Sequence, residues 1–92
     1  MVKARAHIYV SGKVQGVFFR QNTMKKAQSV DVLGWVKNLD DGRVEAVLEG
    51  EEETVKAVIE FCKVGPKGAQ VTEINVNWEL YRGEFQSFNI IY

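Results

Sequence analysis

The sequence has little that could bind a metal or react as a thiol: one cysteine, Cys62, and one histidine, His7, in 92 residues. A single cysteine excludes an internal disulfide, and these two residues cannot supply the ligands of a structural zinc ion. No apolar run approaches the roughly 18 residues that span a membrane, and the N-terminus lacks the apolar core of a signal peptide. These absences predict a cytoplasmic protein that uses no metal and no cofactor.

An excess of charge of either sign is also missing, because 12 Lys and Arg residues balance 12 Asp and Glu residues. Dedicated nucleic-acid binders carry a basic excess, since phosphate contacts dominate their affinity. A small molecule with one phosphate needs only a local positive pocket, so it stays a possible partner. With 46% hydrophobic residues, the chain has enough apolar material for one core, and we expect one domain over residues 1–92.

What the sequence does contain is clear periodicity. Alternating apolar residues predict strands at 5–11, 32–39, 43–49 and 72–80, and a short terminal strand at 88–92. Apolar residues at helical spacing predict one helix from Phe19 and a second after the acidic run 51–53. The Asp-Asp-Gly sequence at 40–42 predicts a hairpin turn, and Gly65-Pro66 is expected to end the second helix.

The order of these elements, βαββαβ with a terminal strand, predicts an α+β protein. Two similar halves, each with one helix, are typical of the ferredoxin-like sandwich. We expect an antiparallel sheet with both helices on one face. This architecture supports many unrelated functions, so the function has to be inferred from a site.

The segment 12–20, with the sequence GKVQGVFFR, connects a strand end to a helix start. A glycine-containing loop at a helix N-terminus can point several backbone amides at an anion, assisted by the helix dipole. Gly16 permits unusual backbone angles, and Arg20 can add a two-pronged guanidinium contact to phosphate. Nothing in the segment resembles the Walker loop of nucleotide-binding proteins. The residue types alone leave two interpretations open: an anion site, or an ordinary connection whose arginine is a surface charge.

The same segment resembles the acylphosphatase signature G-x-V-Q-G-V-x-F-R. All seven specified positions match: Gly12, Val14, Gln15, Gly16, Val17, Phe19 and Arg20. Residues 34–42 resemble the family's second signature, G-W-V-x-N-x-x-D-G, with Lys37 where arginine is common. Gly65-Pro66 followed by Ala69 and Val71 is also similar to the family's pattern before its fourth strand. The resemblance covers essentially the whole chain.

This resemblance implies an enzyme that hydrolyses the carboxyl–phosphate bond of acyl phosphates to a carboxylate and inorganic phosphate. It implies Arg20 and Asn38 as catalytic residues, without a metal, a cofactor or a covalent intermediate. Substrate phosphate would be bound by Arg20 and by the loop residues Gln15, Gly16, Val17, Phe18 and Phe19, mainly through backbone amides. Asn38 would orient the attacking water, because an amide cannot act as a general base. The expected partner is a small acyl phosphate, and the protein is expected to be a monomer.

The remaining notable side chains are expected to have structural roles. His7 lies on the polar side of the first strand, with neither a partner nor a pocket evident. Cys62 lies on the apolar stripe of the second helix, as a small buried hydrophobe would. Others are expected to support the fold: Trp35 and Trp78 by packing, the acidic run 49–53 as a solvated helix start, and Ser11 and Thr23 by hydrogen bonds within the neighbouring loop.

Parts of the sequence also suggest three other functions. A regulatory module that binds phosphate without turnover would have no use for Asn38. An RNA-binding domain is suggested by the aromatic and glycine residues of 13–19, but such motifs belong on a central strand and not at a loop. A domain of a larger carbamoyl-transferring maturation protein would continue into cysteine-rich zinc modules, whereas this sequence stops at Tyr92.

Overall fold

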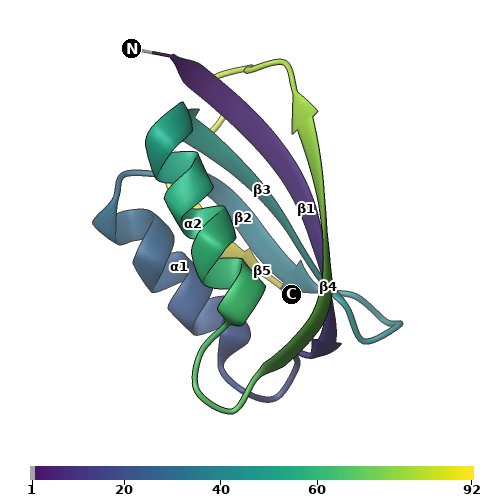
Figure 1. Cartoon of the computed structure of the whole chain (residues 1–92). Helices are drawn as coiled ribbons and strands as arrows, with labels where there is room; N and C mark the ends of the chain where they lie inside the picture. Colours follow the sequence, from purple (N-terminus) through teal and green to yellow (C-terminus); the bar gives the residue numbers. More distant parts are fainter. Residues whose placement is uncertain (1) are drawn as a thin grey trace.

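The computed structural model describes residues 2–92 and confirms the predicted order of the elements. The elements are β1 (Lys3–Lys13), α1 (Phe19–Ser29), β2 (Leu33–Asn38), β3 (Val44–Glu51), α2 (Glu52–Val64), β4 (Gln70–Glu79) and β5 (Phe88–Ile91). The strands form one sheet in the order β4-β1-β3-β2-β5. Both helices cover the same face of this sheet (Figure 1). The α+β, ferredoxin-like class is therefore confirmed.

The terminal strand differs from the expectation of an antiparallel sheet. β1, β2, β3 and β4 pair antiparallel, but β5 pairs parallel with β2, with Gly34 opposite Phe88. The sheet is therefore mixed. The reason is that β4 and β5 lie on opposite edges, so residues 80–87 must cross the whole sheet between them. Alternation within a strand predicts which side chains are buried but carries no information on strand direction.

The core lies between the sheet and the two helices, as the periodicity predicts. The inward-facing rows of β1 and β3 and the predicted helical stripes are buried: Ala6, Ile8, Val10, Val44, Ala46, Leu48, Phe19, Thr23, Ala27, Val55, Val58, Ile59 and Cys62. Full burial of a Val, Ile, Leu or Phe side chain contributes about 1.5–3 kcal/mol, so these rows supply most of the stability. The prediction for Cys62 is confirmed, and burial raises the pKa of its thiol to about 12.

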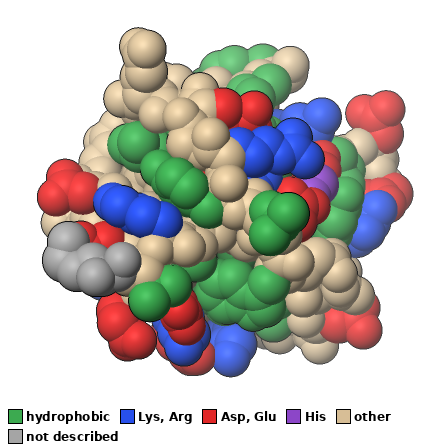
Figure 2. Space-filling model, turned by 90° about the horizontal axis from the view of Figure 1, so that it is seen from above, with side chains coloured by type: hydrophobic (Ala, Val, Ile, Leu, Met, Phe, Trp, Pro, Cys, Tyr) green, Lys and Arg blue, Asp and Glu red, His purple; other side chains and the backbone are tan. Residues whose placement is uncertain are grey.

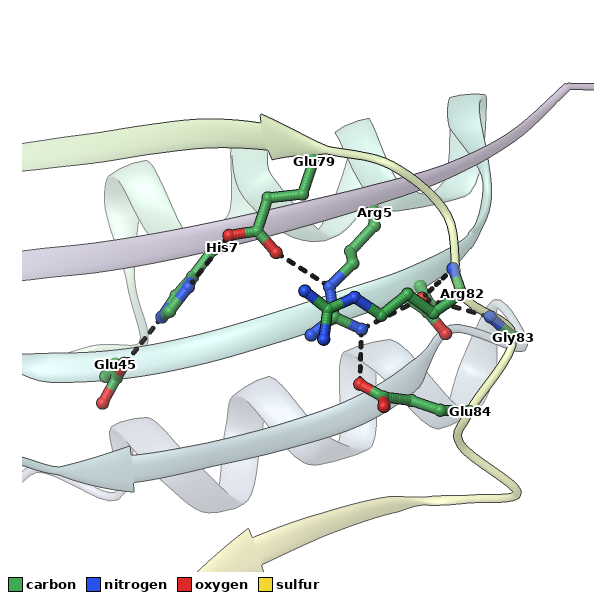
Figure 3. A network of polar contacts seen from close by, with 8 residues as sticks. Arg5, His7, Glu45, Glu79, Arg82, Gly83 and Glu84 are labelled. Carbon is green, nitrogen blue, oxygen red and sulfur yellow. Dashed lines mark hydrogen bonds and ion pairs between the residues drawn. The ribbon is translucent and has the colours of Figure 1, made fainter.

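The opposite face of the sheet carries a polar network around Arg5 (Figure 3). Its guanidinium contacts Glu49 at 3.1 Å, Glu79 at 2.9 Å and Glu84 at 2.7 Å. Glu49 is only 2% exposed, so its assignment to a solvated helix start is wrong. The register explains the error: Glu49 lies opposite Arg5 on β3, three residues before α2 begins.

His7 has partners that the sequence did not reveal. Its Nε2 lies 2.6 Å from Glu45 Oε2 and its Nδ1 lies 3.4 Å from Glu79 Oε2. Both carboxylates are diagonal neighbours across the ladder, because Glu45 lies opposite Tyr9 and Glu79 lies opposite Arg5. Such contacts depend on register, which no local pattern shows. At the end of the molecule seen in Figure 2, acidic and basic side chains are interspersed, in keeping with the zero net charge.

Three smaller expectations also need correction. Thr23 is fully buried on α1, and its hydroxyl lies 3.9 Å from the Cys62 sulfur on α2 and not in a hydrogen bond to the loop. It is one helical turn beyond the loop, so its side chain faces α2. Trp78 lies on the edge strand β4 and is 50% exposed, so it packs less completely than a core residue. β4 itself ends at Glu79, one residue earlier than expected.

Candidate functional site

β1 and β2 both pair antiparallel with β3, so they run in the same direction and finish at the same end of the sheet. Val10 of β1 and Asn38 of β2 both lie opposite Val44, the first residue of β3, one on each side of it. The loop that follows β1 therefore leaves the sheet beside Asn38. Because Gly34 and Val36 are buried toward the helices, alternation places the Asn38 side chain on the same face, where α1 begins.

The connection from β1 to α1 is shorter than the sequence suggested. Gly12 and Lys13 belong to β1, with a bulge between Ser11 and Gly12, so the loop consists of residues 14–18. A Cβ atom at Gly12 would lie 2.1 Å from the Gln70 carbonyl oxygen, which only glycine avoids. Val14 is fully buried in the core and anchors the start of the loop. The loop can therefore hold a defined shape.

The N-terminus of α1 is open to an anion. The first amides of a helix have no partner within it, and here no side chain caps them and no acidic residue occupies the first turn. Phe18, which precedes the helix, has left-handed backbone angles (φ 61°, ψ 28°), an uncommon and strained state for a non-glycine residue. Gly16 also has a positive φ of 76°, which glycine adopts without strain. The strain at Phe18 lies immediately before the first turn of α1.

A pocket of about 230 Å³ lies at this helix N-terminus. It is lined by residues of the loop, of the first turn of α1 and of the end of β2: Val14, Gly16, Phe18, Phe19, Arg20, Gln21 and Asn38. The structure thus brings together the two residues predicted to be catalytic, Arg20 and Asn38. Of the predicted loop residues, Gln15 and Val17 do not line the pocket. Gln21 was missed, although its place one residue after Arg20 in the first turn could have indicated it.

Arg20 carries the positive charge of this pocket. Within residues 2–92, no carboxylate lies within ion-pair distance of its guanidinium. Its Cζ atom lies 5.1 Å from the centre of the Tyr92 ring, a distance typical of a cation–π contact. The ring thus contacts the guanidinium without neutralising it, which leaves the charge available to an anion in the pocket.

Asn38 has an unusual hydrogen-bonding state. Its Oδ1 atom is buried and has no hydrogen-bond partner, and among residues 2–92 it is the one buried side-chain polar atom of this kind. Leaving a buried acceptor unpaired costs about 1–3 kcal/mol. Asn38 also lines the pocket, so its side-chain amide is a polar group at the wall of this pocket.

Gln15 faces away from the pocket, toward the β2–β3 hairpin. Its Nε2 donates to the carbonyl oxygens of Leu39, at 2.8 Å, and of Arg43, at 2.9 Å. The backbone amide of Gln15 is predicted to bind phosphate, and this side-chain contact does not bear on that prediction. The side chain is committed to the protein and not to a ligand.

The described residues contain neither a cluster of metal ligands nor a helix that could span a membrane. Within residues 2–92, no group of three or more His, Cys, Asp and Glu side chains is arranged to hold a metal ion. No helix in the same part of the chain is long and apolar enough to cross a membrane. The positive groups that line the pocket are Arg20 and the N-terminal end of α1.

Comparisons with known proteins agree with this geometry. The family model of acylphosphatases matches residues 6–90. An acylphosphatase from Pyrobaculum islandicum is 58% identical over 92 residues, which cover 99% of this chain and 97% of the relative. The crystal structure of acylphosphatase from Bacillus subtilis is 38% identical, with a TM-score of 0.93, over 97% of this chain and 99% of that chain.

The same fold also occurs as a small part of larger proteins. In the crystal structure of HypF from T. kodakarensis, the matched region is 35% identical with a TM-score of 0.82, over 99% of this chain but only 12% of that chain. The Pyrobaculum relative, in contrast, is matched along nearly its whole length. The sequence match along the whole chain and the close structural match lead to one conclusion. This chain belongs to the acylphosphatase family of enzymes.

Proposed function

We propose that this protein hydrolyses the carboxyl–phosphate bond of acyl phosphates, with the phosphate held at the start of α1 and the attacking water oriented by Asn38. One observation carries the proposal: a single pocket contains the Arg20 side chain, the uncapped first turn of α1 and the side chain of Asn38, whose Oδ1 is buried and unpaired. The first two groups suit an anion, and the third suits a water molecule beside it.

Substrate binding is assigned to the loop and to Arg20. The transferred phosphoryl group carries negative charge on its three equatorial oxygens. Backbone amides of residues 15–20 can donate to these oxygens, and the Arg20 guanidinium can donate two parallel hydrogen bonds. Donors that are fixed before the reaction stabilise the charge of the transition state without reorganisation.

We assign the activation of the water to its placement by Asn38 and not to proton removal by a general base. The Asn38 amide oxygen accepts a hydrogen bond from water but takes up no proton at neutral pH. Acyl phosphates have a good leaving group, and phosphoryl transfer through a loose transition state needs little help from a base. Holding the water in line with the breaking bond therefore suffices. The water proton passes to a phosphate oxygen of the substrate, and the carboxylate leaves with the electrons of the broken P–O bond.

The proposal also covers the substrate class, the oligomeric state and the cellular compartment of the enzyme. The partner is a small acyl phosphate, and the protein works as a monomer in the cytoplasm. The balanced charges and the local nature of the positive pocket support a small phosphorylated substrate rather than a nucleic acid. A filter-binding measurement with RNA tests this part, and retention of RNA at physiological salt would contradict it.

The central test is a spectrophotometric assay with an aromatic acyl phosphate, with and without a metal chelator. We expect turnover that chelation leaves unchanged. Asn38→Ala should lower kcat far more than it raises KM, because the amide acts on the water and not on the substrate. Absence of turnover, strict metal dependence, or a normal kcat in Asn38→Ala would contradict the proposed mechanism.

A further inference from the structure

The Gln15 side chain links the loop to the base of the β2–β3 hairpin by two hydrogen bonds. Its amide nitrogen uses both hydrogens, one for the Leu39 carbonyl (2.8 Å) and one for the Arg43 carbonyl (2.9 Å). An amide group has two donor hydrogens and no more. Gln15 is half-buried and does not line the pocket, so its donors have no capacity left for a ligand.

The two carbonyls lie at the base of the β2–β3 hairpin. Leu39 directly follows Asn38, and Arg43 directly precedes Val44, which lies opposite Asn38 in the ladder. The Leu39 amide donates to the Arg43 carbonyl at 2.8 Å. The Gln15 side chain therefore bonds to both strands of the hairpin, one residue beyond the Asn38–Val44 pair on the side of the turn, and to no other part of the hairpin.

Asn38 needs such support because it is the last residue of β2. Beyond it, residues 40–42 form an exposed turn, and exposed hairpin ends open more readily than the middle of a sheet. The Asn38 side chain, however, must face a water molecule bound over the loop. A displacement of about 1 Å in such an arrangement can cost about 100-fold in rate.

We propose that Gln15 is a positioning residue that sets the distance between the anion-binding loop and Asn38. Its side chain acts through the hairpin backbone on the placement of the water, and this side chain does not touch the substrate. The inference rests on the proposed function, since it matters for catalysis only if Asn38 orients the water. It differs from a general structural role because it predicts a loss of kcat that depends on Asn38.

The test uses two variants of Gln15 and one control. Gln15→Leu removes both donors, and Gln15→Glu has nearly the same shape but directs a carboxylate at two carbonyl oxygens. Gln28→Leu is the matched control: Gln28 also donates to a backbone carbonyl, that of Phe88 at 3.5 Å, but it lies on the exposed part of α1 and away from the pocket lining. Thermal unfolding of each variant is recorded beside kcat, KM and inhibition by inorganic phosphate.

We expect kcat to fall about 10- to 100-fold in Gln15→Leu, with KM and phosphate inhibition changed less than about threefold. The Glu variant should lose at least as much, and Gln28→Leu should keep the kcat of the original protein. If Gln15→Leu does not fold, Gln15→Glu serves the same comparison. A normal kcat in a folded Gln15 variant would overturn the inference.

A double-variant cycle separates positioning from plain stability. In the Asn38→Ala background, Gln15→Leu should lower kcat by less than about twofold, because the group that it positions is already gone. An equal fold-loss in both backgrounds would overturn the inference while leaving the proposed function standing. Near-normal turnover in Asn38→Ala alone would instead contradict the proposed function. It would also overturn the inference on Gln15, which depends on that role of Asn38.

Discussion

Arg5 and Glu49 form an ion pair with Nη1 and Oε2 3.1 Å apart, nearly buried on the face of the sheet that no helix covers. Glu49 also accepts hydrogen bonds from the backbone amides of Arg82 and Gly83, and Arg5 contacts Glu84. These contacts fasten the connection 80–87, which crosses the sheet to place β5 beside β2. The pair is therefore a structural link between the sheet and the terminal strand.

Replacing Arg5 alone should be strongly destabilising. Arg5→Met leaves the Glu49 carboxylate buried without its cation, and breaking such a pair costs about 3–5 kcal/mol of the free energy of unfolding. Urea unfolding followed by circular dichroism measures the loss. The double variant Arg5→Met/Glu49→Leu should recover part of it, because two apolar side chains can replace a buried pair. A loss below about 1 kcal/mol in Arg5→Met would show that the pair is not important for stability.

The stability should also fall in acid. Although burial opposes the effect at Glu49, hydrogen bonds from the Arg82 amide and from Arg5 hold its pKa below the ordinary value of 4.5. At Glu79, the hydrogen bond from Arg5 is the main cause of a lowered pKa. A carboxyl with a lowered pKa in the folded state stabilises the protein above its ordinary pKa. That stability is lost as the pH falls from about 4.5 through the lower folded values.

Urea unfolding between pH 7 and pH 2 measures this dependence. The free energy of unfolding should be nearly constant down to about pH 5 and then decrease steadily. Glu79→Gln should flatten the decrease, because one of the two carboxyls no longer titrates. A free energy that rises on acidification below pH 4 would contradict the assignment.

Arg20 should be essential for turnover. Arg20→Ala removes the charge at the pocket, and one such preorganised contact is worth about 3–4 kcal/mol in the transition state, so kcat/KM should fall by about 100- to 1,000-fold. Lys25→Ala provides the control, since Lys25 is an exposed cation on the same helix and does not line the pocket. Steady-state hydrolysis of an aromatic acyl phosphate measures both. A loss below about tenfold in Arg20→Ala would remove this residue from the proposed binding of phosphate.

Tyr92 should assist Arg20 to a smaller degree. Its ring lies 5.1 Å from the guanidinium and is 93% exposed, and exposed cation–π contacts contribute about 0.5–1 kcal/mol. Tyr92→Ala should therefore weaken inhibition by inorganic phosphate by about two- to fivefold, whereas Tyr92→Phe should retain it. Equal weakening in both variants would point to the hydroxyl group and not to the ring.

The Cys62 thiol should be unreactive in the folded protein. It is buried, and burial is the main cause that raises its pKa to about 12, so almost no thiolate exists at neutral pH. Labelling with an aromatic disulfide reagent should be very slow in buffer and rapid in concentrated urea. The labelling rate in buffer then reports the opening of the core between α1 and α2. Fast labelling under native conditions would contradict the packing described.

Much of the fold followed from local patterns. The alternating rows of β1 and β3 are buried as predicted, and so are Phe19 on the stripe of α1 and Cys62 on the stripe of α2, because a period of two or of 3.6 residues places apolar side chains on one face. The pairing of β5 with β2, the partners of His7 and the burial of Glu49 could not be predicted in this way. Each depends on register or on a crossing connection between residues far apart in the sequence.

The candidate site also has some features that the sequence predicted and others that only the tertiary structure shows. The sequence by itself determined the residue types: a glycine-containing loop, an arginine in the first turn of a helix, and an asparagine at a strand end. Only the tertiary structure decided that Arg20 and Asn38 share one pocket, because β1, which leads into the loop and α1, and β2, which ends at Asn38, pair with β3 on either side of Val44. It also decided that Asn38 Oδ1 is buried and unpaired and that the Gln15 amide bonds to the hairpin. The physical reason is that local chemistry is encoded residue by residue, whereas distances between segments are set by the pairing of the whole sheet.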